Sequence, residues 1–328
     1  MSAKLAENSE KLFIDLSGYA LTGKSAVSNL LQEFEGFSVP DVEFEFGLLR
    51  MKDGLFDLEY SLVSDWSPLR SDAAIRRFIR LVTILGAGYR RYSLKWATSP
   101  SGYNYHKMIH PDFLAISLEY VKSIIDEESF CYWPFYLHDI HSFDCFAQRL
   151  KYFFFKDSVN KDKKYISFGD NFLEKTHHYL HCLFSSGDYA QVMNNTFEPY
   201  RASEVSKYFG CGKSIVVDRD PRAIFAASKE SRYSDFTEVS SFIKYFKETR
   251  KRAEFSISQD NVLLINFEDL INSYEQSLEK IYNFLGVDEK LHVNKGIFFN
   301  PKKSAENLDK WKIVLNSNEI LAIENNLK

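Results

Sequence analysis

Apolar residues along the chain alternate between short continuous runs and helical spacings. The run KLFID, from Lys11 to Asp15, is typical of a buried parallel strand. A stretch with apolar residues three and four positions apart follows from Ala26 to Phe34, which predicts one buried face of a helix. Gly36 stands where a C-terminal cap would end that helix. The chain therefore opens with a strand, a loop and a helix.

Later segments repeat this alternation. Extended patterns occur at Ser38 to Leu49 (SVPDVEFEFGLL), Lys163 to Asp170, Lys213 to Asp220 and Asn261 to Leu270, with helical patterns between them and after the last one. Strands separated by helices predict an α/β fold with a mostly parallel central sheet flanked by helices. We expect one domain over residues 11–320, with a helical insertion over about residues 71–160 that forms the acceptor side.

Composition narrows the class of protein. A chain of 328 residues can form one large α/β domain, and its net charge of −4 argues against a dedicated nucleic-acid binder. No window approaches the roughly 18 consecutive apolar residues that a membrane span requires. The four cysteines lie far apart, which predicts reduced thiols in a cytoplasmic protein. The pattern does not indicate an oligomeric state.

The loop after the first strand fits a phosphate-binding pattern. Gly18-Tyr-Ala-Leu-Thr-Gly23-Lys24-Ser25 matches G-x-x-x-x-G-K-[ST], and it stands between a strand and a helix as that motif requires. Its N–H groups and the helix N-terminus favour an anion, Lys24 can place an ammonium on a phosphate, and Ser25 can donate to a phosphate or hold a metal ion. The alternative is a tight turn that only packs the helix and leaves Lys24 solvated.

Two later segments indicate which phosphate-bearing ligand the loop binds. SIVVDRDPRAIFAAS, from Ser214 to Ser228, resembles the strand, turn and helix with which sulfotransferases bind the 3′-phosphate of 3′-phosphoadenosine 5′-phosphosulfate (PAPS). The resemblance assigns that contact to Arg219, and to Ser228 one place after the usual serine position, where Ala227 stands. NVLLINFEDL with the helix after it, and FFNPKKSAENLDKWK from Phe298 to Lys312, are similar to the family's last strand and its basic loop over the nucleotide.

The resemblance covers about residues 11–50 and 190–312. It implies a P-loop-containing nucleotide-binding fold, PAPS as co-substrate and no required metal. In the basic loop it assigns donor contacts to Lys302, Lys303 and Ser304. In the first loop it implies that the donor is held by these residues: Gly18, Thr22, Gly23, Lys24, Ser25 and Ala26.

The loop departs from the family at its lysine. Leu21 occupies the position where sulfotransferases usually carry the catalytic lysine, so we expect Lys24 to act in its place. The carbohydrate-acting relatives take the acceptor proton with a carboxylate after the first helix, which makes Glu43 the first candidate base and Glu45 the second. A solvated strand face explains these glutamates equally well, with Phe44 and Phe46 buried opposite. The other candidate bases are histidines: His106, His110, His177, His178 and His181.

Three functions remain open at this point. The first is a PAPS-dependent sulfotransferase that moves a sulfuryl group to a hydroxyl or amine of a small-molecule or glycan acceptor. We expect the acceptor to be a glycan or other cell-surface precursor, with Arg50, Asp53 and Asp57 as candidates for lining its pocket; a polar turn explains these three residues equally well. The second is a P-loop kinase that uses ATP and Mg²⁺, in which Asp218 ends a buried strand near the metal. The third is a nucleotide-binding homologue without catalytic activity.

Overall fold

The computed structural model describes residues 11–41, 44–87, 104–131, 133, 135, 142–154, 162–185, 189–231, 236 and 238–327. The chain forms two compact units. The first unit combines Met1–Gly47 with Ser186–Lys328, and the second is Leu48–Ser185. The helical insertion expected over about residues 71–160 falls inside the second unit, and its role as an acceptor side stays a prediction.

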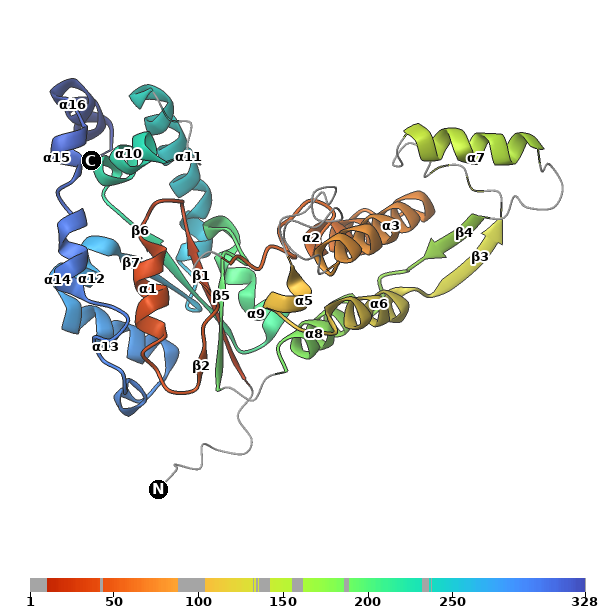
Figure 1. Cartoon of the computed structure of the whole chain (residues 1–328), viewed down its shortest axis with the longest axis horizontal. Helices are drawn as coiled ribbons and strands as arrows, with labels where there is room; N and C mark the ends of the chain where they lie inside the picture. Colours follow the sequence, from red (N-terminus) through yellow and green to blue (C-terminus); the bar gives the residue numbers. More distant parts are fainter. Residues whose placement is uncertain are drawn as a thin grey trace. The chain divides into compact units, whose positions relative to one another are not determined.

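A five-stranded sheet forms the centre of the first unit (Figure 1), in the order β2-β5-β1-β6-β7 with every pair parallel. Its strands are β1 (Leu12–Gly18), β2 (Phe37–Ser38), β5 (Ala190–Asn194), β6 (Gly212–Asp218) and β7 (Val262–Asn266). The carboxyl ends of parallel strands share one edge of a sheet, and ligands of open α/β sheets bind there. The segments that follow β1, β6 and β7 therefore start at the same edge.

Helices cover both faces of this sheet. Leu12, Ile14 and Leu16 of β1 pack into a core with α1 and α13 on one face. Phe13 of the same strand points to the other face, where its ring centroid lies 4.7 Å from that of Phe209 in α9. The prediction of an α/β fold with a mostly parallel sheet between helices is confirmed. The helices of this unit, with 3-10 helices marked η, are α1 (Lys24–Leu31), η3 (Pro199–Glu204), α9 (Val205–Phe209), α10 (Pro221–Glu230), α11 (Val239–Ile257), α12 (Phe267–Asn272), α13 (Tyr274–Leu285), η4 (Glu289–Leu291), α14 (Pro301–Ser304), η5 (Ala305–Asn307), α15 (Trp311–Val314) and α16 (Ser317–Asn326).

The C-terminal helices α15 and α16 pack against α10 and α11, and the four gather at one end of the unit (Figure 1). Their shared core contains Phe225, Phe242, Leu315 and Ile323. This core is separate from the one beneath α1, and it gives α10 apolar contacts with α11, α15 and α16.

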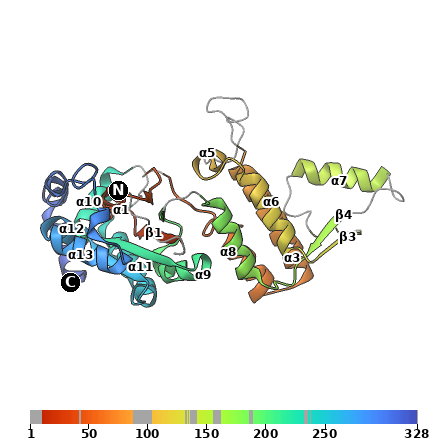
Figure 2. The same cartoon turned by 90° about the horizontal axis from the view of Figure 1, so that it is seen from below.

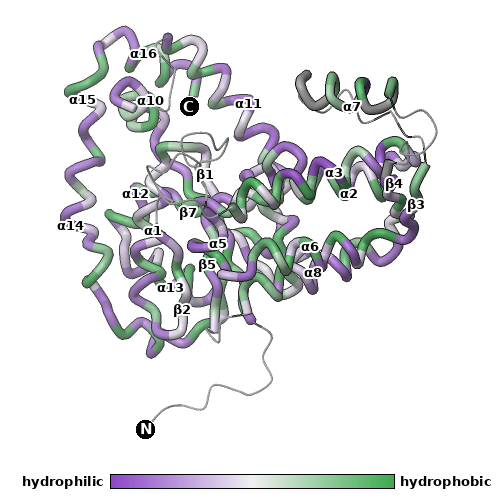
Figure 3. Tube along the Cα trace, turned by 45° about the vertical axis from the view of Figure 1, so that its right-hand side comes forward, coloured by the Kyte–Doolittle hydropathy of each residue, from purple (hydrophilic) through white to green (hydrophobic). Residues whose placement is uncertain are grey.

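The second unit is built mainly of helices. Its long helices α3, α6 and α8 lie together, with α6 in contact with both others (Figure 2). Hydrophobic and hydrophilic residues alternate along each of them (Figure 3). Tyr120 of α6 stacks on Tyr179 of α8 at 4.4 Å, which joins these two helices. Its elements are α2 (Leu55–Glu59), the π-helix η1 (Tyr60–Ser64), α3 (Pro68–Leu85), α5 (Tyr105–Met108), α6 (Phe113–Ile124), β3 (Glu127–Cys131), α7 (Ser142–Phe154), β4 (Asp162–Ile166) and α8 (Phe172–Leu183). The predicted strand at Lys163 is β4, which pairs antiparallel with β3 outside the main sheet.

The extended segment expected from Ser38 to Leu49 is wrong for most of its length. Of the described residues from Phe37 to Leu49, only Phe37–Ser38 pairs with β5, and Phe44 to Phe46 form no strand. Pro40 has no N–H to donate to a neighbouring strand, which is consistent with the chain leaving the sheet there. Phe44 and Phe46 are buried nonetheless, with Glu45 between them more exposed. Of the described helices, none combines the length and apolar character needed to cross a membrane.

Candidate active site

The loop from Tyr19 to Gly23 connects β1 to α1. Ala20, Leu21 and Gly23 all have left-handed backbones, with φ of 67°, 57° and 85°. A Cβ atom on Gly23 would lie 2.5 Å from the ring of Phe267, so this position requires glycine. Among the described residues, no N–H group from Ala20 to Gly23 donates to a protein acceptor. These donors and the start of α1 form a cradle suited to an anion.

Lys24, the first residue of α1, lies beside a carboxylate. Its Nζ is 3.7 Å from Oε1 of Glu45, and 16% of the lysine side chain is exposed. Glu45 was the second candidate base, and the structure brings it to the lysine expected to act on the donor. Glu43, the first candidate, lies outside the described residues. Ser25 is exposed, and Thr22 and Ala26 are buried.

The turn after β5 holds this carboxylate in place. The side-chain amide of Asn195 donates to Oε1 of Glu45, and Asn195 has a left-handed backbone with φ of 46°. The Asn195 N–H donates to the carbonyl of Leu16 in β1 at 2.8 Å, and the next N–H, of Thr196, donates to Oδ1 of Asp15 at 2.8 Å. Glu45 is thus tied through one turn to the central strand of the sheet.

Asp15 is a carboxyl group buried in the middle strand. Burial raises its pKa to about 7, against the opposing effects of the Thr196 N–H and the charge of Lys24. Its Oδ2 has no hydrogen-bond partner among the described residues. Near neutral pH this group therefore exists in both protonation states, within the electrostatic range of Lys24.

Arg219 follows β6 at the same edge of the sheet. Its side chain is 10% exposed, and its Nη2 donates to the carbonyl of Asn307 at 2.7 Å. Its guanidinium carbon lies 4.7 Å from the ring centroid of Phe267, the ring that also packs on Gly23. Burial lowers the pKa of Arg219, and the charge of Glu268 opposes that shift. The described residues leave its Nε without a hydrogen-bond partner.

The basic segment after α13 reaches Arg219 through Asn307. Lys302 and Lys303 are exposed in α14, where the side chain of Asn300 accepts hydrogen bonds from both of their N–H groups. Ser304 ends the same short helix. The segment therefore meets the end of β6 while its lysines face solvent.

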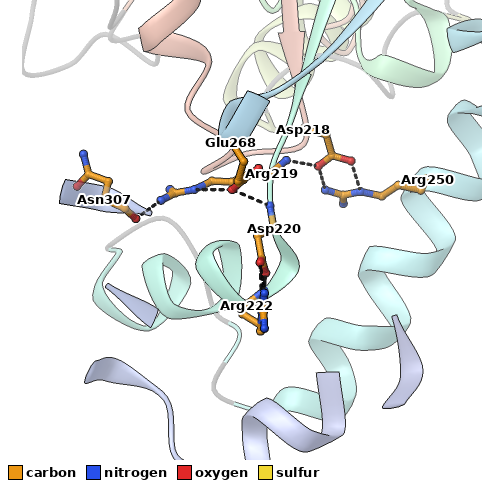
Figure 4. Close-up of polar contacts among 7 residues, drawn as sticks. All are labelled: Asp218, Arg219, Asp220, Arg222, Arg250, Glu268 and Asn307. Carbon is orange, nitrogen blue, oxygen red and sulfur yellow. Dashed lines mark hydrogen bonds and ion pairs between the residues drawn. The ribbon is translucent and has the colours of Figure 1, made fainter. Parts of the chain in front are cut away.

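Asp218 and Arg219 are adjacent but have different partners (Figure 4). Arg250 of α11 binds both oxygens of Asp218, at 2.6 and 3.1 Å. The Arg219 N–H adds a third hydrogen bond, to Oδ1 at 2.8 Å. The guanidinium of Arg250 is also stacked between Tyr19 and Phe246, at 3.8 and 3.7 Å from the ring centroids. Both carboxylate oxygens of Asp218 are thus bound by Arg250.

Ser228 lies on another side of α10 from the half-buried Ala227. Its hydroxyl is buried and donates to the carbonyl of Phe225 at 2.7 Å. It lines a cavity together with Tyr19 and Leu21, and Arg219 is not among the described residues that line it. A shift of one residue turns a helical side chain by about 100°, which explains the different side.

The histidine candidates lie in the second unit. His177 and His181 of α8 approach each other with 3.1 Å between their Nε2 atoms, and His178 contacts Cys182. Asp53 and Asp57 are joined by a hydrogen bond from the Asp53 N–H, and both line a cavity of about 170 Å³. In the part of the chain that the structure describes, no group of three or more potential ligands could hold a metal ion.

Asp15, Asn195, Arg250 and Phe267 were missed from the sequence. Asp15 gave the only usable signal, because it is the one charged residue within the run LFIDL. Asn195 and Arg250 meet their partners through contacts between segments far apart in the chain, which residue spacing does not reveal.

The chain matches no protein-family model and no curated protein sequence. Its structure is similar to the sulfotransferase domain of the Synechococcus PCC 7002 olefin synthase, with 12% identity, a TM-score of 0.41, and coverage of 98% of this chain and 96% of that one. It is also similar to the sulfotransferase domain from the curacin biosynthetic pathway, with 12% identity, a TM-score of 0.40 and coverage of 97% of both chains. Retinol dehydratase, in complex with androsterone and inactive cofactor PAP, is 13% identical, with a TM-score of 0.36 and coverage of 98% of this chain and 82% of that chain. Likeness at this level does not carry over an activity, so the function is proposed from the residues of this chain.

Proposed function

We propose that this protein is a sulfotransferase that moves a sulfuryl group from PAPS to a hydroxyl group of a small-molecule or glycan acceptor. The observation that carries the proposal is the contact between Lys24 and Glu45 beside the cradle. Sulfuryl transfer needs a cation on the departing phosphate oxygen and a base for the acceptor proton. Lys24 and Glu45 supply these two groups side by side.

Each part of the site has a role in this reaction. The N–H groups from Ala20 to Gly23 would hold the 5′-phosphosulfate end, and Arg219 would bind the 3′-phosphate, with Lys302 and Lys303 adding positive charge. The acceptor oxygen forms a bond to sulfur while the bond between sulfur and the bridging phosphate oxygen breaks. Glu45 takes the acceptor proton, and 3′-phosphoadenosine 5′-phosphate leaves with its new charge next to Lys24. The bonds and the proton of this transfer balance without a redox change and without a metal ion.

The kinase alternative is disfavoured by the contacts of Asp218. A kinase of this type needs that carboxylate near Mg²⁺, but Arg250 binds both of its oxygens. We also propose a cytoplasmic location, on the ground of the widely spaced cysteines.

Transfer of ³⁵S from labelled PAPS to a panel of hydroxyl acceptors tests the proposal. Lys24→Ala should lower kcat about 100-fold or more, because an aimed cation is lost from the leaving group. Lys280→Ala, at an exposed position of α13, is the matched control and should keep full activity. If Lys24→Ala keeps full turnover, Lys24 does not stabilise the leaving phosphate. Binding of 3′-phosphoadenosine 5′-phosphate without transfer to any acceptor would support the inactive homologue.

A further inference from the structure

Two histidines of α8 face each other across one turn of the helix. His177 and His181 are four positions apart, which places their side chains on the same side of α8. Their Nε2 atoms are 3.1 Å apart, whereas their ring centroids are 4.4 Å apart. Because the nitrogens are closer together than the rings that carry them, the two Nε2 atoms are turned toward each other.

The distance between the nitrogens fits two ligands of one metal ion. Imidazole nitrogens bind Zn²⁺ at about 2.0–2.1 Å, so two of them lie about 2.9 Å apart at a right angle and about 3.4 Å apart at the tetrahedral angle. The observed 3.1 Å falls between these two values. Histidines at positions i and i+4 of a helix supply two zinc ligands in other proteins. The pair therefore needs little rearrangement to chelate an ion.

The fold holds this pair in place and leaves it accessible. Thr176 and Tyr179 of α8 are buried and form hydrogen bonds with α6, which lies beside α8 (Figure 2). These contacts fix the turns of α8 that carry the histidines. His177 and His181 are each partly exposed, so an ion from solution can reach them.

The nitrogen ligands determine which ions suit the site. Imidazole is a good ligand for Zn²⁺, Ni²⁺ and Cu²⁺, whereas Mg²⁺ and Ca²⁺ prefer oxygen ligands. In the part of the chain that the structure describes, no third His, Cys, Asp or Glu completes the ligand group. Water would take the remaining positions, which makes this an exchangeable site rather than a closed structural one.

A second pair on α8 is the competing location for an ion. His178 and Cys182 are also four positions apart, with 3.6 Å between Nε2 and Sγ. A thiol must lose its proton before it binds a metal, whereas a neutral imidazole can bind directly. This difference favours His177 and His181.

We propose that His177 and His181 form a binding site for a divalent transition-metal ion such as Zn²⁺. The ion would link two turns of α8 and stabilise the folded second unit, because the unfolded chain does not hold the two nitrogens together. The site is separate from the proposed sulfuryl transfer and has no step in it.

Titration calorimetry with ZnCl₂ tests the site on the full chain after metal has been removed by dialysis against EDTA. Saturable binding is expected, and MgCl₂ should not compete. His177→Ala and His181→Ala should each weaken binding at least about tenfold, because each removes one of the two protein ligands. His178→Ala, at the neighbouring exposed position, is the matched control and should keep the affinity. Alanine favours a helix, so far-UV circular dichroism should be the same for all three variants.

Thermal unfolding gives a second measurement. Zn²⁺ should raise the melting temperature of the wild type and of His178→Ala, and this shift should be absent in His177→Ala. The proposal is wrong if millimolar Zn²⁺ gives no saturable binding, which would leave the pair as a hydrogen bond only. It is also wrong if His177→Ala binds Zn²⁺ as the wild type does. Losses in His178→Ala or Cys182→Ser as large as those in His177→Ala and His181→Ala would place the ion at the second pair instead.

Discussion

Both carboxylate oxygens of Asp218 are bound by the guanidinium of Arg250, at 2.6 and 3.1 Å. A carboxylate held in this way has no free oxygen for Mg²⁺ unless the ion pair breaks. The contact therefore disfavours the Mg²⁺-dependent kinase and favours the PAPS-dependent sulfotransferase, the two enzyme classes that the loop sequence left open. It also fixes Arg250 against Tyr19, whose ring centroid lies 3.8 Å from the guanidinium carbon.

The first prediction concerns metal dependence. 3′-Phosphoadenosine 5′-phosphate should raise the melting temperature in EDTA as much as in Mg²⁺, because in the proposed site the cradle and Arg219 would bind it without a metal. At a ligand concentration of 100 times Kd the stabilisation amounts to about 2.7 kcal/mol. ATP with Mg²⁺ is the comparison. Stabilisation by ATP that requires Mg²⁺, with none by the bisphosphate, would support the kinase instead.

Arg219 should discriminate between nucleotides with and without a 3′-phosphate. Arg219→Met keeps much of the side-chain volume but loses the charge, which should weaken 3′-phosphoadenosine 5′-phosphate about 10- to 100-fold, since hydrogen bonds to charged groups contribute about 1.5–3 kcal/mol. Adenosine 5′-monophosphate should bind with unchanged Kd. Arg252→Met, at an exposed arginine of α11, serves as control. Equal losses for both nucleotides would show that Arg219 only supports the fold around Asn307.

Asn195 should act as a positioning residue for Glu45. Asn195→Gly tolerates the left-handed backbone and removes the amide that donates to Glu45. We expect kcat to fall about tenfold while the KM for PAPS stays constant, because the donor does not contact this amide. Asn171→Gly is a matched control, since Asn171 is also left-handed but lies at the start of α8. A rise in KM with constant kcat would contradict the role.

Much of the first unit could be predicted from the sequence, because β1, β6 and β7 contain short apolar runs and α1 has a clear apolar face. β5 was missed because Gln191 and Asn194 interrupt its five buried residues, so it has neither a continuous apolar run nor strict alternation. Glu45 could be proposed as the second candidate base because the carbohydrate-acting sulfotransferases that the sequence resembles carry a carboxylate after the first helix. Its partner Asn195 could not, since 150 residues separate the two. They meet because β2 pairs with β5 and the Phe46 N–H donates to the Asn194 carbonyl at the end of β5 at 3.0 Å.

Glu33 and His292 form a buried contact that should stabilise the first unit. His292 Nε2 lies 2.7 Å from the Glu33 carboxylate, whose other oxygen accepts the N–H groups of Phe298 and Phe299. Glu33→Gln should cost about 1–3 kcal/mol at pH 7, against less than about 0.5 kcal/mol for Glu35→Gln at an exposed position nearby. Chemical denaturation of both variants measures the difference.

The loss in Glu33→Gln should depend on pH. Burial alone would raise the pKa of Glu33, but the hydrogen bonds from His292 and the backbone outweigh it and hold the pKa below 4.5. A carboxylate with a lowered pKa contributes stability above its unfolded pKa and loses it as pH falls through the folded pKa. The gap between wild type and Glu33→Gln should therefore narrow below about pH 4. A gap that is constant from pH 7 to pH 3 would contradict the assignment.

Asp15 should give the opposite pH dependence of stability to Glu33. Its pKa is raised from 3.8 to about 7 in the folded chain, so the native state binds the proton more tightly than the unfolded state. Stability then falls as pH rises from about 4 to 7 and is level above that range, by an amount on the order of 4 kcal/mol. Asp15→Asn keeps an oxygen for the Thr196 N–H but cannot ionise, so it should gain stability relative to wild type as pH rises from 4 to 8. Asp260→Asn, at an exposed position before β7, is the control and should follow wild type. If Asp15→Asn also follows the wild-type curve, Asp15 is ionised in the folded protein and its charge is fully compensated by its surroundings, including Lys24.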